Sequence, residues 1–305
     1  MLTSSRGLAA TFLAGTAFVA TPVFATETNE TVAGSEARPV AQTIEIEAID
    51  ALIGDGQADA PADAFSVEAD ALERVIAPVD KPSKAGGDSG VEFSANVALT
   101  TEYRFRGVDL SGGELAIQGG FDVTLPAGFY VGTWASSLDE TTVGYGSTEL
   151  DVYGGWSGDV TDGVALDVGV IGYLYPDAGP GDFDYVEFYG SVAFTFGPAE
   201  TTLGVAYAPD QDSLGSTDNL YLYTDVGIGI PNTPITINGH LGYTDGFLTF
   251  TNDGKAWDWS IGAEVAIPDT PLSVSAAYVG AEGDIPAGFY DFVDDAFVVT
   301  VSASF

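Results

Sequence analysis

The chain of 305 residues is strongly acidic, with 45 Asp and Glu against 8 Lys and Arg and a formal net charge of −37. Such a chain lacks the basic surface that binding to phosphates requires, which excludes nucleic acid as a partner. Cysteine is absent, so disulfides and thiolate metal sites are excluded as well.

Residues 1–25 have the pattern of an export signal. Arg6 supplies a positive charge, an apolar run covers residues 8–20, and residues 23–25 (Val-Phe-Ala) form a cleavage site that ends in a small residue. We therefore expect a signal peptide that is removed after residue 25. The alternative, an N-terminal membrane anchor, is disfavoured because the apolar run is short.

Residues 26–90 form an acidic segment rich in Ala and Pro, with 14 acidic residues. The segment carries too few apolar residues to offset the entropy lost when a chain is ordered. We predict a disordered periplasmic segment. The alternative is a docking helix or a pore plug, for which the window 65–76 offers Phe65, Leu72, Val75 and Ile76 on a shared face.

An alternation of apolar and polar residues begins at Val91 and continues to the end of the sequence. Its clearest example is residues 92–106, EFSANVALTTEYRFR, in which Phe93, Val97, Leu99, Tyr103 and Phe105 share one face. Ordinary strands have about five or six residues, whereas a strand that crosses a bilayer needs roughly nine to eleven. The alternation therefore predicts one long strand over 92–106, with its apolar face toward lipid and its polar face toward a lumen.

The same pattern predicts twelve strands within residues 91–305. They are expected near 92–106, 114–124, 128–137, 148–157, 164–175, 184–196, 200–208, 219–230, 235–244, 257–267, 271–280 and 295–305, and the side chains of the third fit either face. Short turns and longer loops alternate, as they do in outer-membrane barrels. We predict an all-β, antiparallel up-and-down transmembrane β-barrel with both ends in the periplasm. A globular sandwich is the rival fold, but its strands would be shorter.

Five blocks of the barrel region carry a family resemblance. They are VALTTEYRFRGVDLSGGELAIQGGFDV (97–123), GFYVGTWAS (128–136), STELDVYGGWSG (147–158), VALDVGVIGYLYP (164–176) and DYVEFYGS (184–191). These blocks resemble the TorF-type porin family, which are proteobacterial outer-membrane β-barrels. The resemblance implies an outer-membrane porin of a Gram-negative bacterium over residues 91–305, and it brings no catalytic residues with it. Segment 26–90 is an addition to the family pattern.

Charged residues recur on the strand face opposite the apolar side chains. The alternation predicts that this opposite face lines the lumen. The charged residues on it are Glu92, Glu102, Arg104, Arg106, Glu114, Asp122, Glu149, Asp151, Asp167, Glu187, Asp225, Asp258 and Glu264. Carboxylates are costly to bury without cations, so we predict a water-filled lumen. Their excess over arginine predicts a preference for cations. We expect Arg106 to lie across the first hairpin from Glu114.

His240 is the only histidine. Its phase places it in the lumen, where we expect a solvated side chain rather than a catalytic or proton-sensitive group. Asp210, Asp212 and Asp218 loosely resemble a calcium loop, but Tyr221 stands where the bidentate Glu would be. We therefore expect no enzymatic activity, no cofactor and no specific metal site.

Two functions remain open. The first is a porin-like channel for passive diffusion of small solutes, with outer-membrane lipid and small hydrophilic solutes or cations as its partners. The second is a non-conducting structural or surface-interaction barrel that acts through its acidic extracellular loops or its N-terminal arm. The polar lumen face favours the channel, and the sequence leaves the oligomeric state open.

Overall fold

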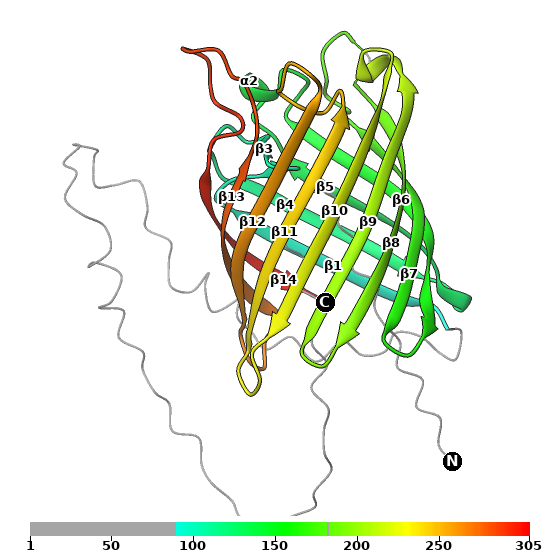
Figure 1. Cartoon of the computed structure of the whole chain (residues 1–305). Helices are drawn as coiled ribbons and strands as arrows, with labels where there is room; N and C mark the ends of the chain where they lie inside the picture. Colours follow the sequence, from blue (N-terminus) through cyan, green and yellow to red (C-terminus); the bar gives the residue numbers. More distant parts are fainter. Residues whose placement is uncertain (1–89, 182) are drawn as a thin grey trace, which may run out of the picture. The chain divides into compact units, whose positions relative to one another are not determined.

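The computed structural model describes residues 90–181 and 183–305, which form a closed barrel of antiparallel strands (Figure 1). The barrel wall consists of twelve strands, so the predicted fold class is confirmed. The predicted signal peptide, the window 65–76 and the predicted acidic segment up to residue 89 lie outside the described residues, as does Asp182.

The wall strands follow one another in chain order, each antiparallel to its neighbours. They are β1 (Glu92–Thr100), β4 (Ala116–Thr124), β5 (Phe129–Ser137), β6 (Thr148–Thr161), β7 (Val164–Leu174), β8 (Tyr185–Phe196), β9 (Ala199–Gln211), β10 (Thr217–Gly229), β11 (Ile235–Gly246), β12 (Lys255–Ala266), β13 (Leu272–Ala281) and β14 (Ala296–Ser304). The ring closes where β1 pairs with β14. Closure pairs the edge strands with each other and leaves no open edge.

The outer surface of the barrel is apolar because of the two-residue period of the strands. Phe93 and Phe297 are 59% and 73% exposed although they are large apolar residues. The structure also resolves the ambiguous third strand. Val131 of β5 is exposed, whereas Tyr130 and Trp134 are buried on the lumen side.

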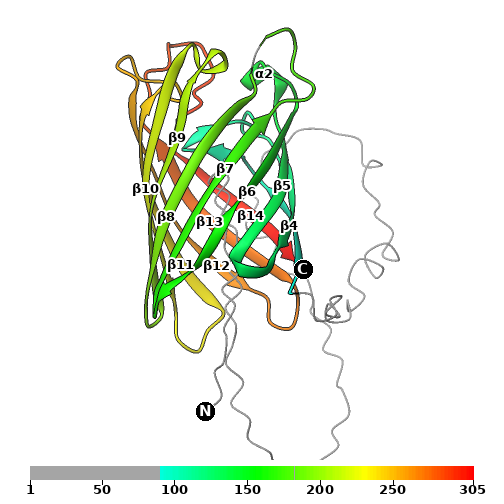
Figure 2. The same cartoon turned by 90° about the vertical axis from the view of Figure 1, so that its right-hand side faces the viewer.

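Short turns and longer connections lie at opposite ends of the barrel (Figure 2). The short ones are 125–128, 162–163, 197–198, 230–234 and 267–271, and those at the other end are 101–115, 138–147, 175–184, 212–216, 247–254 and 282–295. The arrangement follows the prediction, but the first of the longer connections is longer than predicted and the fourth is shorter. β9 and β10 extend beyond their predicted ends, so the connection between them is only 212–216.

Helix is limited to single turns in the described part of the chain. These are α2 (Glu140–Val143) and the 3-10 turns η1 (Pro126–Gly128) and η2 (Asp212–Leu214). The side chain of Asp139 caps α2 by accepting a hydrogen bond from the Thr142 amide. No helix within residues 90–181 and 183–305 has the length and hydropathy to cross a membrane.

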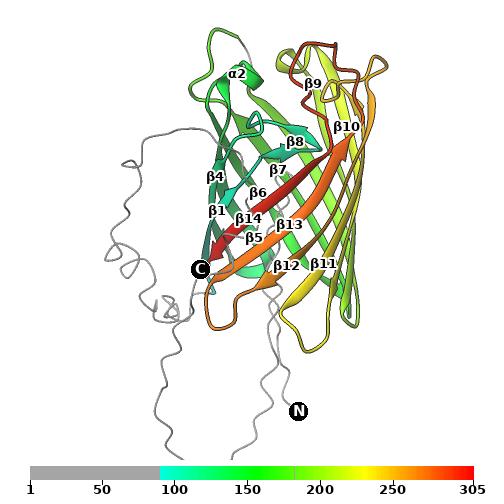
Figure 3. The same cartoon turned by 90° about the vertical axis from the view of Figure 1, so that its left-hand side faces the viewer.

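The first strand ends earlier than predicted. β1 stops at Thr100, where its pairing with β4 also ends, and residues 101–115 leave the wall. The chain then forms a short hairpin, β2 (Arg104–Phe105) with β3 (Val108–Asp109), near the end of β1 (Figure 3). The prediction of one strand over 92–106 is therefore wrong. A period of two describes a wall strand and an inner hairpin equally well, so the pattern contains no signal for the change.

Candidate functional site

The lumen is arranged around the inner hairpin, which we define as residues 101–113. β2 and β3 pair with each other and leave Arg106 and Gly107 as a two-residue turn. Both residues have positive φ, 50° and 79°, as the commonest two-residue hairpin turns require. Glycine adopts this conformation freely, whereas a residue with a Cβ, such as Arg106, is strained by about 1 kcal/mol.

The return of the hairpin is organised by Asp109, which is buried. Its carboxylate accepts hydrogen bonds from the backbone amides of Ser111 at 2.8 Å and Gly113 at 2.7 Å. The hydroxyl of Tyr290, in connection 282–295, also donates to Asp109. The Ser111 hydroxyl in turn accepts from the Tyr103 amide at 2.9 Å. One aspartate therefore fixes the backbone of the returning chain, as it does in Asx-turns.

Arg104 attaches the hairpin to connection 282–295. Its Nη1 donates to the carbonyl oxygens of Asp294 at 2.9 Å and Gly107 at 3.0 Å, and its Nη2 lies 2.9 Å from Asp294 Oδ1. Arg104 also pairs with Glu102. Burial raises the pKa of Glu102 above its ordinary value, although the charge of Arg104 acts in the opposite direction. The buried guanidinium is thus compensated by carboxylates and carbonyl oxygens.

The tip of the hairpin packs closely against β12 and β13 of the wall. A Cβ atom on Gly107 would lie 2.4 Å from Ala281 Cβ, 2.9 Å from the Gly280 carbonyl oxygen and 3.0 Å from Asp258 Cβ. Carbon atoms in ordinary contact are about 3.5–4.0 Å apart, so only glycine fits. The hairpin leaves the wall between β1 and β4, and its tip meets β12 and β13 through Gly107 and β8 and β10 through Arg106, so it crosses the lumen.

Arg106 projects from the tip against β8 and β10. Its Nη2 lies 2.7 Å from Glu187 Oε2. Its Cζ lies 4.2 Å from the centroid of the Tyr221 ring and 4.7 Å from that of Phe105, within the range of about 6 Å for cation–π contacts. The predicted position of Arg106 opposite Glu114 is wrong. Because the hairpin turns inward, Glu114 remains exposed in the connection before β4.

Aromatic side chains of β5 and β7 pack against the aromatic side chains of the hairpin. The Tyr103 ring lies 5.5 Å from Trp134 and the Phe105 ring 5.6 Å from Tyr173, measured between centroids. The Tyr103 hydroxyl donates to Glu149 Oε1 at 2.6 Å. The four aromatic residues belong to one buried hydrophobic cluster. The hairpin is therefore held by packing as well as by charge, and buried aromatic pairs of this kind stabilise beyond their area.

His240 on β11 joins carboxylates from the two neighbouring strands. Its Nδ1 lies 2.6 Å from Asp225 Oδ1 and its Nε2 lies 2.9 Å from Asp258 Oδ1. The Tyr221 hydroxyl is 2.8 Å from Nε2 as well. The prediction of a solvated histidine is wrong, since His240 is only 8% exposed. Its partners lie 15 and 18 residues away in the sequence, so only the strand pairing reveals them.

Two carboxylates nearer the short turns, those of Asp122 and Asp167, remain partly exposed. Asp122 accepts a hydrogen bond from the Tyr153 hydroxyl at 2.6 Å, and Asp167 accepts one from the Tyr130 hydroxyl at 2.7 Å. Both aspartates have intermediate exposure. This part of the lumen therefore combines tyrosine hydroxyls with carboxylates that water reaches.

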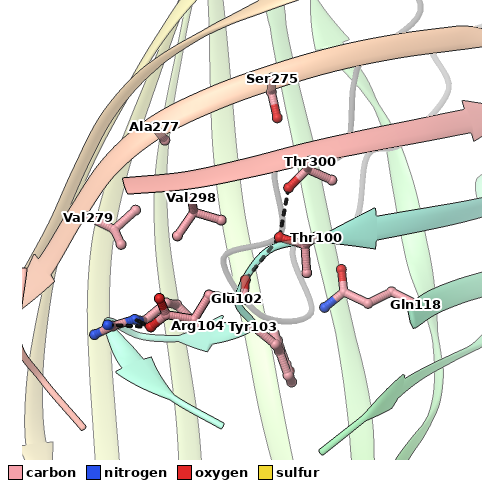
Figure 4. Close-up of a pocket in the computed structure, with 10 residues that line it drawn as sticks. All are labelled: Thr100, Glu102, Tyr103, Arg104, Gln118, Ser275, Ala277, Val279, Val298 and Thr300. Carbon is pink, nitrogen blue, oxygen red and sulfur yellow. Dashed lines mark hydrogen bonds and ion pairs between the residues drawn. The ribbon is translucent and has the colours of Figure 1, made fainter. Parts of the chain in front are cut away.

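A small cavity lies beside the hairpin, against β1, β4, β13 and β14 (Figure 4). Its volume is about 20 Å³, which is room for about one water molecule. Neutral polar groups of Thr100, Gln118, Ser275 and Thr300 line it, and the Thr300 hydroxyl donates to that of Thr100 at 2.9 Å. Glu102 is the one carboxylate among its lining residues. Arg104, which pairs with Glu102, also lines the cavity.

Asp177 ties two of the long connections together. Its Oδ2 accepts hydrogen bonds from the Ser147 amide at 2.9 Å and from the Ser147 hydroxyl at 2.5 Å. These bonds favour the ionised carboxylate and hold the pKa of Asp177 below its ordinary value. Connections 138–147 and 175–184 are therefore joined by a contact that depends on this charge.

The structure sorts the predicted lumen-facing residues into groups. Glu149, Glu187 and Asp258 contact the hairpin, Asp151 and Asp225 lie next to them, and Glu102, Arg104 and Arg106 belong to the hairpin itself. Asp122, Asp167 and Glu264 lie nearer the short turns, Glu92 is exposed at the start of β1, and Glu114 is exposed in a connection. Asp122 and Asp167 are partly exposed, whereas Glu264, although nearer the short turns, is buried as Glu149 and Glu187 are.

Sequence reasoning missed the aromatic half of the site. Tyr103 and Phe105 were expected on the lipid face as part of a wall strand, and both are buried against the lumen wall. The available signal was the dipeptide Arg106-Gly107, because glycine in a two-residue connection between alternating stretches is typical of a hairpin turn.

The acidic residues near Asp210 take separate positions. Asp212 accepts a hydrogen bond from the Ser216 hydroxyl, and Asp218 accepts one from the Tyr207 hydroxyl. In the part of the chain that the structure describes, no group of three or more His, Cys, Asp or Glu side chains is placed to hold one metal ion.

Several solved structures are similar to the barrel. The KdgM porin in complex with disordered oligogalacturonate matches with a TM-score of 0.48 and 8% identity, over 70% of this chain and 99% of that one. An outer membrane channel from Pseudomonas putida F1 matches with a TM-score of 0.41 and 10% identity, over 74% and 98%. OmpF from Salmonella typhi, in complex with daunomycin, matches with a TM-score of 0.39 and 9% identity, over 72% of this chain and 99% of that one. Likenesses this distant carry no argument about the function of this chain.

No curated protein matches the sequence. A family model does match, over residues 84–305, and its description is "Bacterial protein of unknown function (Gcw_chp)". The match includes every strand of the barrel and the whole inner hairpin. The chain therefore belongs to the Gcw_chp family of bacterial proteins of unknown function.

Proposed function

We propose that this protein is an outer-membrane channel for passive diffusion of small hydrophilic solutes. The observation that carries the proposal is a closed barrel with an apolar outside and an ionisable inside. The wall strands have 9 to 14 residues, enough for a tilted crossing of a bilayer, which needs about 9–11. Exposed side chains such as Phe93 and Phe297 would meet lipid, and the carboxylates of the opposite face would meet water.

In this proposal the long connections face the outside of the cell and the short turns face the periplasm, as in bacterial outer-membrane barrels. The backbone amide of Ser304 donates to the Pro271 carbonyl oxygen, so the end of β14 lies at the short-turn end. Segment 26–90 would then extend into the periplasm after removal of residues 1–25. The resemblance of blocks such as 128–136 to TorF-type porins supports the same assignment.

Cations are the solutes that this lumen would favour. Its described carboxylates are Asp122, Glu149, Asp151, Asp167, Glu187, Asp225, Asp258 and Glu264, and the positive or protonatable side chains are Arg104, Arg106 and His240. The carboxylates outnumber their partners. A negative wall inside a low-dielectric barrel concentrates cations and repels anions.

The inner hairpin would set the size of the pore. Its tip touches β12 and β13 through Gly107, and its base is held by Arg104. Because the hairpin is held across the lumen between these two contacts, it would narrow the pore at the level of the hairpin. We therefore propose that the docked hairpin admits only very small solutes and that the pore widens when the tip withdraws.

A non-conducting barrel that acts through its loops is the second candidate, and one observation favours it. Tyr103 and Phe105 are buried against Trp134 and Tyr173, so the hairpin fills part of the lumen as a hydrophobic core would. In that case the acidic outer connections would be the functional surface.

Swelling of proteoliposomes separates the two candidates. The full-length protein is reconstituted and challenged with neutral solutes of increasing size at equal osmolality, with protein-free liposomes as the control. A channel predicts fast swelling with the smallest solutes and a rate that falls with solute size. Swelling no faster than in protein-free liposomes for every solute would exclude the channel and leave the non-conducting barrel.

A further inference from the structure

The wall around Arg106 is built as a cation site that the protein's own hairpin occupies. We define the guanidinium cage as Glu187 together with the rings of Tyr173, Tyr185 and Tyr221. We propose that this cage, when the hairpin tip withdraws, binds a small solute cation that bears a guanidinium or primary ammonium group. The inference rests on the proposed channel only for the route by which the solute arrives, since binding is a property of the cage itself.

The cage already binds a guanidinium group in the docked state. The Arg106 Nη2–Glu187 Oε2 distance is 2.7 Å, and the Arg106 Cζ lies 4.2 Å from the Tyr221 ring centroid. The rings of Tyr173 and Tyr185 stack with centroids 4.5 Å apart, and Tyr173 also packs against Phe105, the neighbour of Arg106, at 5.6 Å. A carboxylate beside an aromatic face, here Glu187 beside Tyr221, is the combination that recognises guanidinium and ammonium groups.

Arg106 does not use the full capacity of this site. Glu187 Oε1 and both carboxylate oxygens of Asp151 are buried and have no hydrogen-bond partner among the described residues. Both side chains are 0% exposed, and Asp151 lies close enough to Glu187 for their charges to interact. Arg106 Nη1 is also buried without a partner in the same region. Buried acceptors without donors are costly, so a cation whose N–H groups reach these oxygens would form hydrogen bonds that Arg106 leaves unmade.

The lining also decides which class of cation fits. Metal ions are disfavoured, because within residues 90–181 and 183–305 no group of three or more ligating side chains is placed to hold one. Aromatic faces favour weakly hydrated organic cations over strongly hydrated small ions. Anions would meet the Glu187 carboxylate, and a neutral solute would leave that buried charge uncompensated.

The backbone conformation of Arg106 indicates that the guanidinium group, rather than the geometry of the turn, explains an arginine at this position. Its φ is 50°, a conformation that glycine or asparagine adopts more easily. A turn optimised for stability alone would carry one of those residues at this position. The strained arginine instead places its guanidinium in the cage, where it acts as an internal substitute for a solute cation.

The test uses Arg106→Gly, which empties the cage and relieves the left-handed backbone without changing the turn. The thermal midpoint of the full-length protein in detergent is measured with millimolar guanidinium chloride, with equal urea and with equal NaCl. Urea has the planar shape of guanidinium without its charge. We expect guanidinium to raise the midpoint of R106G by about 2–4 °C once it exceeds its dissociation constant severalfold. Urea and NaCl should produce no shift, and neither should guanidinium with the wild type, whose cage is occupied.

The double variant Arg106→Gly/Glu187→Gln is the matched control, because it removes the charge of the cage and keeps its shape. We expect it to lose the guanidinium response. If R106G does not fold, Arg106→Asn replaces it, since asparagine tolerates the same backbone. No shift in the folded variant, or an equal shift in the double variant or the wild type, would overturn the proposal. Because binding is measured without a membrane, a protein that binds guanidinium but gives no liposome swelling would refute the channel and keep the cage.

Discussion

Replacement of Gly107 by alanine tests whether the inner hairpin limits the pore. Gly107 has a φ of 79° and Gly144, at the end of α2, has a φ of 77°. A Cβ on Gly144 would meet nothing within 4 Å, whereas one on Gly107 would meet the wall. Gly144→Ala is therefore a control with the same backbone cost and no steric clash.

The difference between the two variants follows from the contact at the tip. Both pay about 1 kcal/mol for a side chain at positive φ. The new methyl group at Gly107 would lie 2.4 Å from Ala281 Cβ, so the tip must retreat by about 1 Å to reach an ordinary contact of about 3.5 Å. Overpacking of this kind costs about 1–3 kcal/mol more. Retreat would also lengthen the 2.7 Å contact between Arg106 and Glu187.

The assay is single-channel recording of wild type, G107A and G144A in planar bilayers, with thermal unfolding in detergent as the stability measure. We expect a larger conductance for G107A and an unchanged one for G144A, with G107A the less stable of the two. Equal conductance of all three folded proteins would refute the role of the hairpin in limiting the pore.

Three further predictions concern the lumen, the loops and the topology. Asp167→Asn should lower the ratio of cation to anion permeability, because it removes a partly exposed lumen charge while its oxygen still accepts from tyrosine; an unchanged ratio would argue against this wall as the selective surface. The Asp177–Ser147 contact should persist above the ordinary carboxyl pKa of 3.8 and be lost as pH falls through the lower folded value; protection of the Ser147 amide from hydrogen exchange that persists at pH 2 would contradict this. A tag at Gly146 should be labelled on intact cells and one at Ala127 should not, and the reverse pattern would invert the proposed orientation.

The wall of the barrel could be predicted from the sequence because a wall strand has two different environments on its two faces. The alternation in residues such as 164–174 records those environments directly, and the strand and its lipid face follow from it. Val131 and Tyr130 were ambiguous because both are large and either fits an apolar surface. Their assignment depended on the neighbouring strands, which the local pattern does not contain.

The contents of the lumen could not be predicted in the same way. Tyr103 and Phe105 continue the alternation of β1, although the chain has already left the wall at Thr100. Likewise, Asp225 and Asp258 become partners of His240 only through the pairing of β10, β11 and β12. Such contacts depend on how strands far apart in the sequence pair with one another. The number and spacing of acidic residues along the chain do not reveal that pairing.

The reversal potential of the wild-type protein across a KCl gradient at pH 7 tests the central claim most directly. An acidic, water-filled lumen predicts discrete current steps whose reversal potential is displaced toward that of potassium. The displacement should shrink at molar salt, where the screening length falls to about 3 Å. The absence of steps from protein that is folded and inserted would contradict the channel, and a displacement toward the chloride potential would contradict the acidic lumen.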